Sequence, residues 1–338
     1  APPKPEDFEP APEPSASTGL FSYKFTPNER LSYRLNAEIG GTGLDLGEGS
    51  AINMSMGSDI SLLTEAVDTT GAGDLKMLFD QVDMTGSFMG SPIEVHDSPS
   101  RTTAQLDDRT RIDTQRGDST KGIPQLDFFR KPVRMKVAKD GEVLRVAGAR
   151  GMEQMLTSLM KVPGTELPSA EAKPGYQWDS TFKMPVPGFG TAVDAVAHNT
   201  LTGYTQIDGR QCAVVEQIIE SEQTGGTLNS PESLLGPEMQ FAMPSFRLDG
   251  RNTVYFDTAE GKLVRTDLDL DIGLEIGGQL NELASTIIGA YSEALGGAEN
   301  PRMAPPKQPQ PKNLELGVNV KATLDLVGQG QLPDKPIN

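Results

Sequence analysis

The stretch "MKVAKDGEVLRVAG" (135–148) and the later stretch "NTVYFDTAEGKLVRTDLDL" (252–270) share one pattern. In each, an alternating apolar segment leads to an acidic residue and a glycine, and a second alternating segment follows. The glycines after Asp140 and Glu260 can supply the positive φ angle that a tight turn needs, and the flanking valine, leucine and tyrosine suit a pleated sheet. Both stretches are therefore predicted to be β-hairpins, and their recurrence predicts an internal duplication.

The same alternation of apolar and polar residues extends outward from both hairpins. Before the first hairpin it predicts an antiparallel meander that begins near Phe21, with a turn at 69–74. The polar segment 91–122 is interpreted as a long excursion with one edge strand near 110–114. In the second half, acidic-glycine pairs at 208–209 and 249–250 mark further turns, and Trp178 takes the place that Tyr33 has in the first half.

Two segments change to a helical period. Apolar residues at three- and four-residue spacing predict an amphipathic helix over about 150–161, and a similar stripe that ends on paired glycines predicts a second helix over about 279–296. The residues of the first stripe are Met152, Met155, Leu156, Leu159 and Met160.

We therefore expect a mainly β fold of two related antiparallel curved sheets or half-barrels, each with one amphipathic helix. The expected division of the chain is a Pro-rich N-terminal arm (1–20), a first β half (21–162), a linker (163–175), a second β half (176–328) with a Pro-rich loop (298–313), and a C-terminal tail (329–338).

Composition limits the class of protein. The 30 lysines and arginines against 47 acidic residues give a formal net charge of −17, which disfavours nucleic acid as a partner. No apolar run approaches the length of a transmembrane helix. The six prolines in the first fourteen residues are typical of a stiff linker after a removed signal or lipoprotein leader, so we expect an extracytoplasmic location, in the periplasm or at the cell surface.

The order of these motifs, from "YKF" and "ERLSYRL" through "RKPVRMKVAKDGEVLRVAG" to "KPGYQWDSTFKM" and "EGKLVRTDL", resembles an uncharacterised family of bacterial extracytoplasmic β-rich proteins, a domain of unknown function. The resemblance covers about residues 21–327. It implies export or a lipid anchor, no assigned activity and no catalytic residues.

Residues suited to catalysis or metal binding are few. His96 and His198 are the two histidines, and both are interpreted as surface or strand-face residues. The single cysteine, Cys212, is interpreted as a small buried residue. The acids of "TDLDLDIGLEIGG" (266–278) alternate with aliphatic residues, as on the solvent face of a strand, so they do not predict a calcium site. No catalytic, cofactor-binding or metal site is predicted, and an enzyme is not expected.

Two functions remain open at this level. The first is a non-enzymatic structural or protein-interaction module of a larger bacterial assembly, with other protein subunits as partners; its Pro-rich arms and polar insert would dock on them. The second is a carrier or binding protein for a lipid or other apolar ligand in a half-barrel groove. The residues expected to line such a groove are Met152, Met155, Leu156, Leu159, Met160 and Trp178.

Overall fold

The computed structural model describes thirteen segments of the chain, which carry sixteen β-strands and no helix. The described residues are 21–43, 52–88, 91–98, 100–106, 110–115, 132–147, 166–168, 171–186, 191–223, 226–228, 241–243, 245–276 and 314–331. The strands are β1 (Glu29–Gly43), β2 (Ile52–Val67), β3 (Gly73–Phe88), β4 (Ser91–Asp97), β5 (Arg101–Leu106), β6 (Thr110–Gln115), β7 (Val133–Val137), β8 (Val143–Ala147), β9 (Gln177–Val186), β10 (Thr191–Ile207), β11 (Arg210–Gln223), β12 (Gly226–Leu228), β13 (Phe241–Met243), β14 (Ser245–Asp257), β15 (Lys262–Ile276) and β16 (Leu314–Gln331).

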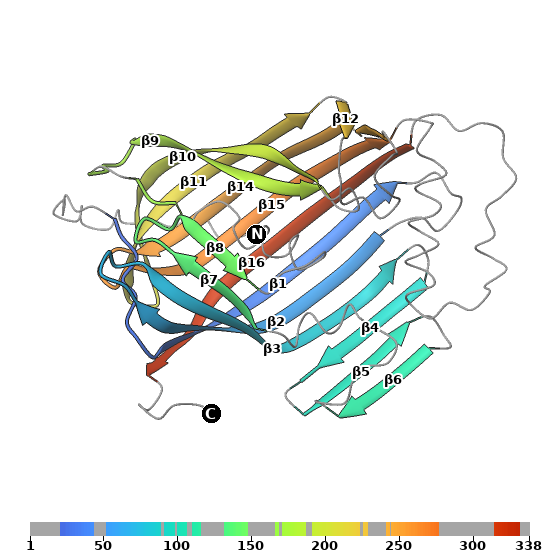
Figure 1. The fold of residues 1–338 in the computed structure, drawn as a ribbon, viewed down its shortest axis with the longest axis horizontal. Coiled ribbons are helices and arrows are strands. Elements are labelled where there is room, and N and C mark those ends of the chain that lie inside the picture. The colour runs from blue at the N-terminus through green and yellow to red at the C-terminus, as the bar shows by residue number, and fades with distance from the viewer. Residues whose placement is uncertain are drawn as a thin grey trace, which may run out of the picture.

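Fourteen of these strands form one antiparallel sheet (Figure 1). Its main path runs β6-β5-β4-β3-β2-β1-β16-β15-β14-β11-β10-β9, and the β7–β8 hairpin branches from β3. The short strands β12 and β13 pair separately with each other. Neighbours along the path are mostly neighbours in sequence, as expected of an antiparallel meander.

The expectation of two sheets is wrong, because the last strand pairs with the first. The β1–β16 register runs from Glu29 opposite Gln331 to Gly43 opposite Leu316. This pairing satisfies the backbone groups along strand edges that two separate sheets would each leave open. The expectation of one helix per sheet is not met either, since the described part of the chain contains no helix, and the segments expected to be helical, 150–161 and 279–296, lie outside it.

Three of the four predicted acidic-glycine turns are confirmed. Gly141, Gly209 and Gly261 have φ angles of 95°, 77° and 65°, and each ends the turn of a hairpin. The turn predicted at 249–250 is wrong, since these residues lie inside β14. At this position a Cβ on residue 250 would lie 2.2 Å from the Leu270 side chain. Glycine therefore allows the neighbouring strand to approach closely.

The two stretches that suggested duplication have different places in the sheet. β7 and β8 are five residues each and form the branch, whereas β14 and β15 have 13 and 15 residues and lie within the main path. Internal duplication therefore stays a prediction.

The segment 91–122, expected to be mainly loop, extends the sheet by three strands, β4, β5 and β6. β6 confirms the edge strand expected near 110–114. The others form because Val95 and Ala104 alternate with polar residues and are buried on one face.

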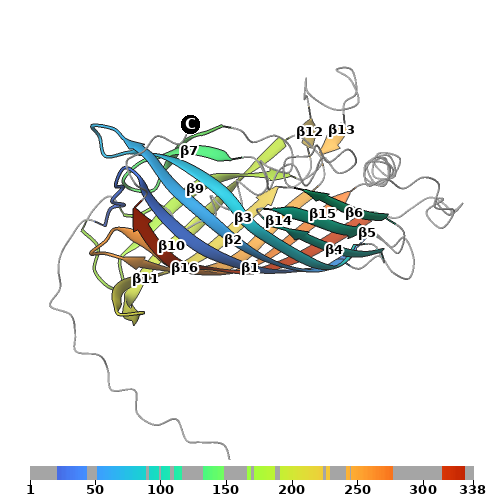
Figure 2. The same cartoon turned by 90° about the horizontal axis from the view of Figure 1, so that it is seen from below.

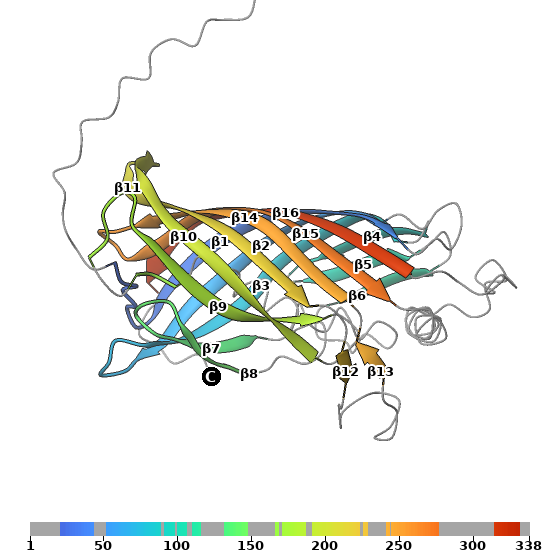
Figure 3. The same ribbon diagram turned by 90° about the horizontal axis from the view of Figure 1, so that it is seen from above.

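The sheet is strongly curved (Figures 2 and 3). Different kinds of side chain line its two faces. The inner face carries three clusters of buried apolar side chains, and the β7–β8 hairpin packs against one of them. The outer face carries cross-strand ion pairs such as Arg34–Asp59 and Lys321–Asp269. Alternation along each strand produces this division, with aliphatic residues inward and acids in solvent.

Candidate functional site

The candidate site is the inner face of the sheet where its two halves meet, on β1 and β16. We call it the central patch. Its apolar residues are Leu35, Ile39, Val318, Ala322, Leu324 and Leu326. Leu35 lies opposite Leu324 in the β1–β16 register, and all six are only partly buried.

Burial varies within and around the central patch, since Ala37 and Val320, which lie between its members on β1 and β16, are 7% and 8% exposed, and Leu268 and Ile272 on β15 are only partly buried. On β15, Leu270 is 1% exposed, and on β2, Ile60 is 2% exposed. The patch connects two buried clusters, one on β1–β5 and β7, the other on β10, β11, β14, β15 and β16, through side chains that are only partly buried. Apolar surface in contact with water favours ligand binding, because covering that surface stabilises the complex by about 25 cal/mol per Å² buried.

A row of polar side chains, buried except for the partly buried Thr266, crosses the inner face beside the patch. We call it the polar row, and its members are Ser180, Asn199, Gln217, Asn252 and Thr266, from β9, β10, β11, β14 and β15 respectively. Their amides and hydroxyls form one directional chain. The Thr266 hydroxyl donates to Asn252 (2.6 Å), and Asn252 donates to Gln217 (2.8 Å). Gln217 then donates to Asn199, which donates to the Ser180 hydroxyl (3.1 Å).

The polar row separates two of the apolar clusters. Along β10, Ala197 belongs to one cluster and Leu201 to the next, with Asn199 between them. Buried polar groups are tolerated when hydrogen-bonded, and a chain of them fixes the register of the strands that it joins. The row thus gives the inner face a polar boundary within an apolar lining.

One end of the curved sheet is closed by the segment 21–28, which we call the N-terminal strap. Its backbone contacts both acidic-glycine hairpins, since the Tyr23 N–H donates to Lys139 O (2.7 Å) and the Lys24 N–H donates to Gly261 O (3.2 Å). Phe21 is buried in the third apolar cluster. The strap therefore joins the β7–β8 turn to the β14–β15 turn across the end of the inner face.

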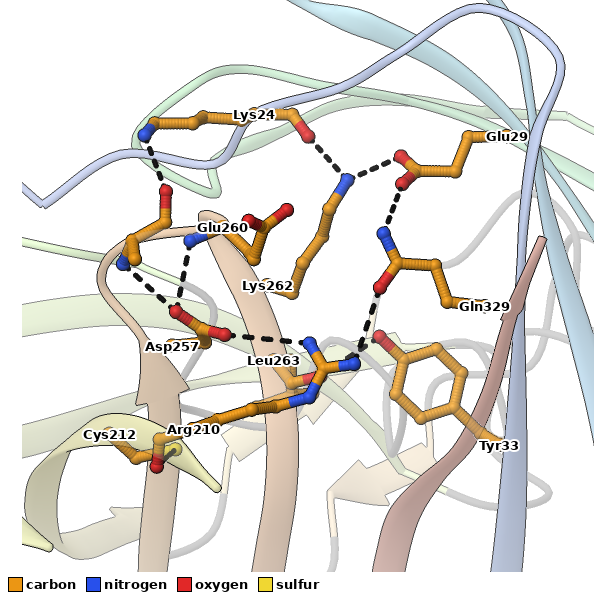
Figure 4. Close-up of polar contacts among 11 residues, drawn as sticks. Lys24, Glu29, Tyr33, Arg210, Cys212, Asp257, Glu260, Lys262, Leu263 and Gln329 are labelled. Atoms are coloured by element: carbon orange, nitrogen blue, oxygen red, sulfur yellow. Dashed lines mark hydrogen bonds and ion pairs between the residues drawn. The ribbon is translucent and has the colours of Figure 1, made fainter. Parts of the chain in front are cut away.

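A polar network centred on the buried Lys262–Glu29 pair fastens the strap (Figure 4). The Lys262 ammonium pairs with the Glu29 carboxylate and donates to Lys24 O (2.6 Å). Gln329 Nε2 donates to Glu29 (2.9 Å), and Arg210 Nη2 donates to Gln329 (3.3 Å).

The same network reaches the base of the β14–β15 hairpin. Arg210 Nη1 lies 3.4 Å from the Asp257 carboxylate, whose other oxygen accepts the N–H groups of Ala259 and Glu260 (both 2.9 Å). The Tyr33 hydroxyl donates to Leu263 O (3.1 Å), and burial raises the pKa of Tyr33 above its ordinary value, so this phenol stays neutral. The positive and negative side chains of the network are matched pair by pair.

Five of the six residues predicted to line an apolar groove lie outside the described part of the chain. Met152, Met155, Leu156, Leu159 and Met160 lie outside the described residues. Trp178 packs against the third cluster, where its Nε1–H donates to Glu166 O (3.3 Å). The sequence pattern did not predict the central patch.

Both histidines lie on the outer face. His198 Nδ1 contacts Asp179 (2.8 Å) and Nε2 contacts Glu220 (3.1 Å), and the hydrogen bond with Asp179 is the main cause that raises the pKa of His198. His96 pairs with Asp83. Cys212 is buried as predicted, and its thiol is free.

Two further observations bear on the chemistry of the molecule. Within the segments that the structure describes, no group of three or more His, Cys, Asp or Glu side chains is placed to hold a metal ion. The described part of the chain also contains no helix that is long and apolar enough to cross a membrane.

Comparison with known proteins gives distant structural likenesses. No family model and no curated protein matches the sequence. A lipovitellin structure, described under the heading of lipid–protein interactions, has a TM-score of 0.43 and 9% identity over 93% of this chain, which spans only 27% of the lipovitellin chain. A DUF1329 family protein from Desulfovibrio piger has a TM-score of 0.18 and 10% identity over 92% of this chain and 88% of its own.

Proposed function

We propose that this chain is a non-enzymatic binding protein that holds a lipid or another apolar ligand against the inner face of its curved sheet. The observation that carries the proposal is the central patch, where six apolar side chains in the middle of the sheet are incompletely covered. Ligand sites of this kind are mostly apolar, with a few polar groups that fix orientation. The polar row and the network under the N-terminal strap supply such groups nearby.

The distribution of charge supports an apolar ligand at this face. Apart from the buried Glu29–Lys262 pair at the start of β1, the ion pairs of β1 and β16 lie on the outer face, for example Arg34–Asp59 and Lys321–Asp269. Both histidines lie there as well, paired with Asp83 and with Asp179 and Glu220. Imidazole-based chemistry would therefore have to take place on the opposite side of the sheet from the patch.

The protein-interaction function favoured by the sequence has less support from the fold. It was drawn from three segments, of which 91–122 contributes three strands to the sheet, while 1–20 and 298–313 lie outside the described residues. Export from the cytoplasm stays a prediction from composition.

A matched pair of variants tests the proposal. Ala322 is in the patch, and the next residue, Thr323, points to the outer face of the same strand. With a fluorescent long-chain acyl probe, we expect saturable binding to the wild type, a loss of about tenfold or more in affinity for Ala322→Trp, and little change for Thr323→Trp. Urea unfolding of both variants serves to confirm that they are folded. No saturable binding by the wild type, or equal losses in the two variants, would contradict the proposal.

A further inference from the structure

The N-terminal strap carries a hydroxyl group whose position in the fold is unusual. The Tyr23 ring packs edge-on against Phe256, with ring centroids 5.1 Å apart, and stacks with Phe25 at 5.9 Å. Phe256 is fully buried in the third apolar cluster. The strap thus turns Tyr23 inward, toward the closed end of the inner face.

The hydroxyl of Tyr23 is buried and has no hydrogen-bond partner within the described part of the chain. Burial raises the pKa of Tyr23 well above its ordinary value, with a further contribution from nearby Tyr33, so the group is a neutral phenol able to donate. A buried polar group without a hydrogen-bond partner destabilises the folded state. In native proteins such a group usually forms a hydrogen bond with a water molecule or a ligand.

Tyr23 packs against the third apolar cluster, and its hydroxyl is close enough to Tyr33 for the two phenols to interact electrostatically. The neighbouring phenol, Tyr33, points to the inner face of β1 and lies opposite Leu326, the last patch residue of β16. The patch runs from there past Leu35 to Ile39, six residues beyond Tyr33, which is roughly 20 Å along a strand. A long apolar chain lying on the patch would therefore place its polar end near Tyr23.

The charges around this end favour an uncharged ligand. Glu29 is already paired with Lys262, and Asp257 with Arg210. A ligand carboxylate entering here would meet two carboxylates and two cations that are already matched, and it would lose its hydration without gaining an ion pair. A neutral oxygen acceptor avoids this cost.

We propose that the Tyr23 hydroxyl donates a hydrogen bond to the ester carbonyl of a neutral acylglycerol, whose acyl chain lies along the central patch. This inference rests on the proposed function and names its ligand class. Tyr23 would then be a specificity-determining residue, since a site with a buried donor discriminates against a ligand that lacks the matching acceptor.

Paired lipids test this inference directly. A monoacylglycerol and the monoalkylglycerol ether of the same chain length differ in the ester carbonyl alone. We expect the wild type to bind the ester about three- to tenfold more tightly than the ether, and Tyr23→Phe to bind both with the weaker affinity. Tyr204→Phe, which removes a phenol oxygen from another tyrosine beside the same apolar cluster, should keep the preference.

Thermal unfolding of the ligand-free protein supplies a second readout. Because the hydroxyl has no partner to lose, Tyr23→Phe should be at least as stable as the wild type. A less stable variant with an unchanged ester preference would show that buried water satisfies the hydroxyl, and would overturn the inference.

Binding of the ester and ether with equal affinity by the wild type would overturn it as well, while leaving the carrier function standing. Failure of the wild type to bind either lipid or the acyl probe would instead reject the proposed function itself.

Discussion

The ammonium of Lys262 lies against the carboxylate of Glu29, and the two side chains are only 6% and 5% exposed. The pair joins the start of β1 to the start of β15, and Lys262 also holds Lys24 O of the N-terminal strap. A buried pair of this kind is costly to break, because the remaining charge keeps its desolvation penalty and loses its partner.

Replacing Lys262 by methionine should lower the free energy of unfolding by about 3–5 kcal/mol, as measured by urea denaturation. The matched control is Lys321→Met, which removes a lysine 3.6 Å from Asp269 in a pair whose side chains are 59% and 54% exposed. That change should cost less than about 1 kcal/mol. Similar losses for the two variants would mean that the buried network does not hold the closed end together.

The packing of the strap on the β14–β15 turn can be isolated with two glycines of like conformation. Gly209 and Gly261 have positive φ angles of 77° and 65°, so alanine should cost about 1–2 kcal/mol at each from backbone strain. A Cβ at Gly209 meets open space, whereas one at Gly261 would lie 2.6 Å from Ser22 O and 2.7 Å from Lys24 N.

Gly261→Ala should therefore be clearly more destabilising than Gly209→Ala in urea unfolding. Equal costs would indicate that the strap does not pack against this turn in solution.

His198 should give the outer face a small pH-dependent contribution to stability. Its pKa is raised in the folded state, first by the hydrogen bond with Asp179 and further by Glu220, so the protonated form is stabilised by folding. The contribution is fully present below the unfolded pKa of about 6.5 and is lost as the pH rises through the folded value.

His198→Gln should then reduce the free energy of unfolding at pH 5.5 by no more than about 1 kcal/mol, because the site is exposed to solvent, and should have no such effect at pH 9. A loss of unfolding free energy that is larger at pH 9 than at pH 5.5 would contradict this prediction.

Cys212 should be unreactive in the native protein. The side chain is buried, and burial raises the pKa of the thiol to about 11, so little thiolate is present at neutral pH. A colorimetric thiol reagent at pH 8 should label unfolded protein within minutes and native protein far more slowly. Rapid native labelling would show that the β10–β11 hairpin opens readily.

The sequence predicted local structure well where side-chain alternation decides it. The acids from Asp267 to Asp271 face solvent, while Leu268 and Leu270 point inward. The turn at 208–209 forms where the acidic-glycine pair predicted it. A turn predicted at 249–250 failed because nothing local reveals that Leu270 of the next strand crowds Gly250. A local pattern says which face a residue takes and not which strand lies beside it.

The candidate site depended on pairing between distant segments, which is why the sequence did not reveal it. Leu35 and Leu324 are ordinary alternating residues until β1 and β16 bring them opposite each other. The Tyr23 hydroxyl likewise becomes notable only when the strap covers Phe256. The helical methionine stripe that the sequence favoured as a groove lies outside the described residues, so that prediction remains open.

Photocrosslinking with a neutral acylglycerol that carries a diazirine on its acyl chain tests the central claim most directly. After irradiation and proteolysis, the account predicts adducts concentrated in the peptides that contain Leu35–Ile39 and Val318–Leu326, competed away by unlabelled lipid. Adducts spread over many peptides without competition, or concentrated on strands remote from β1 and β16, would contradict it.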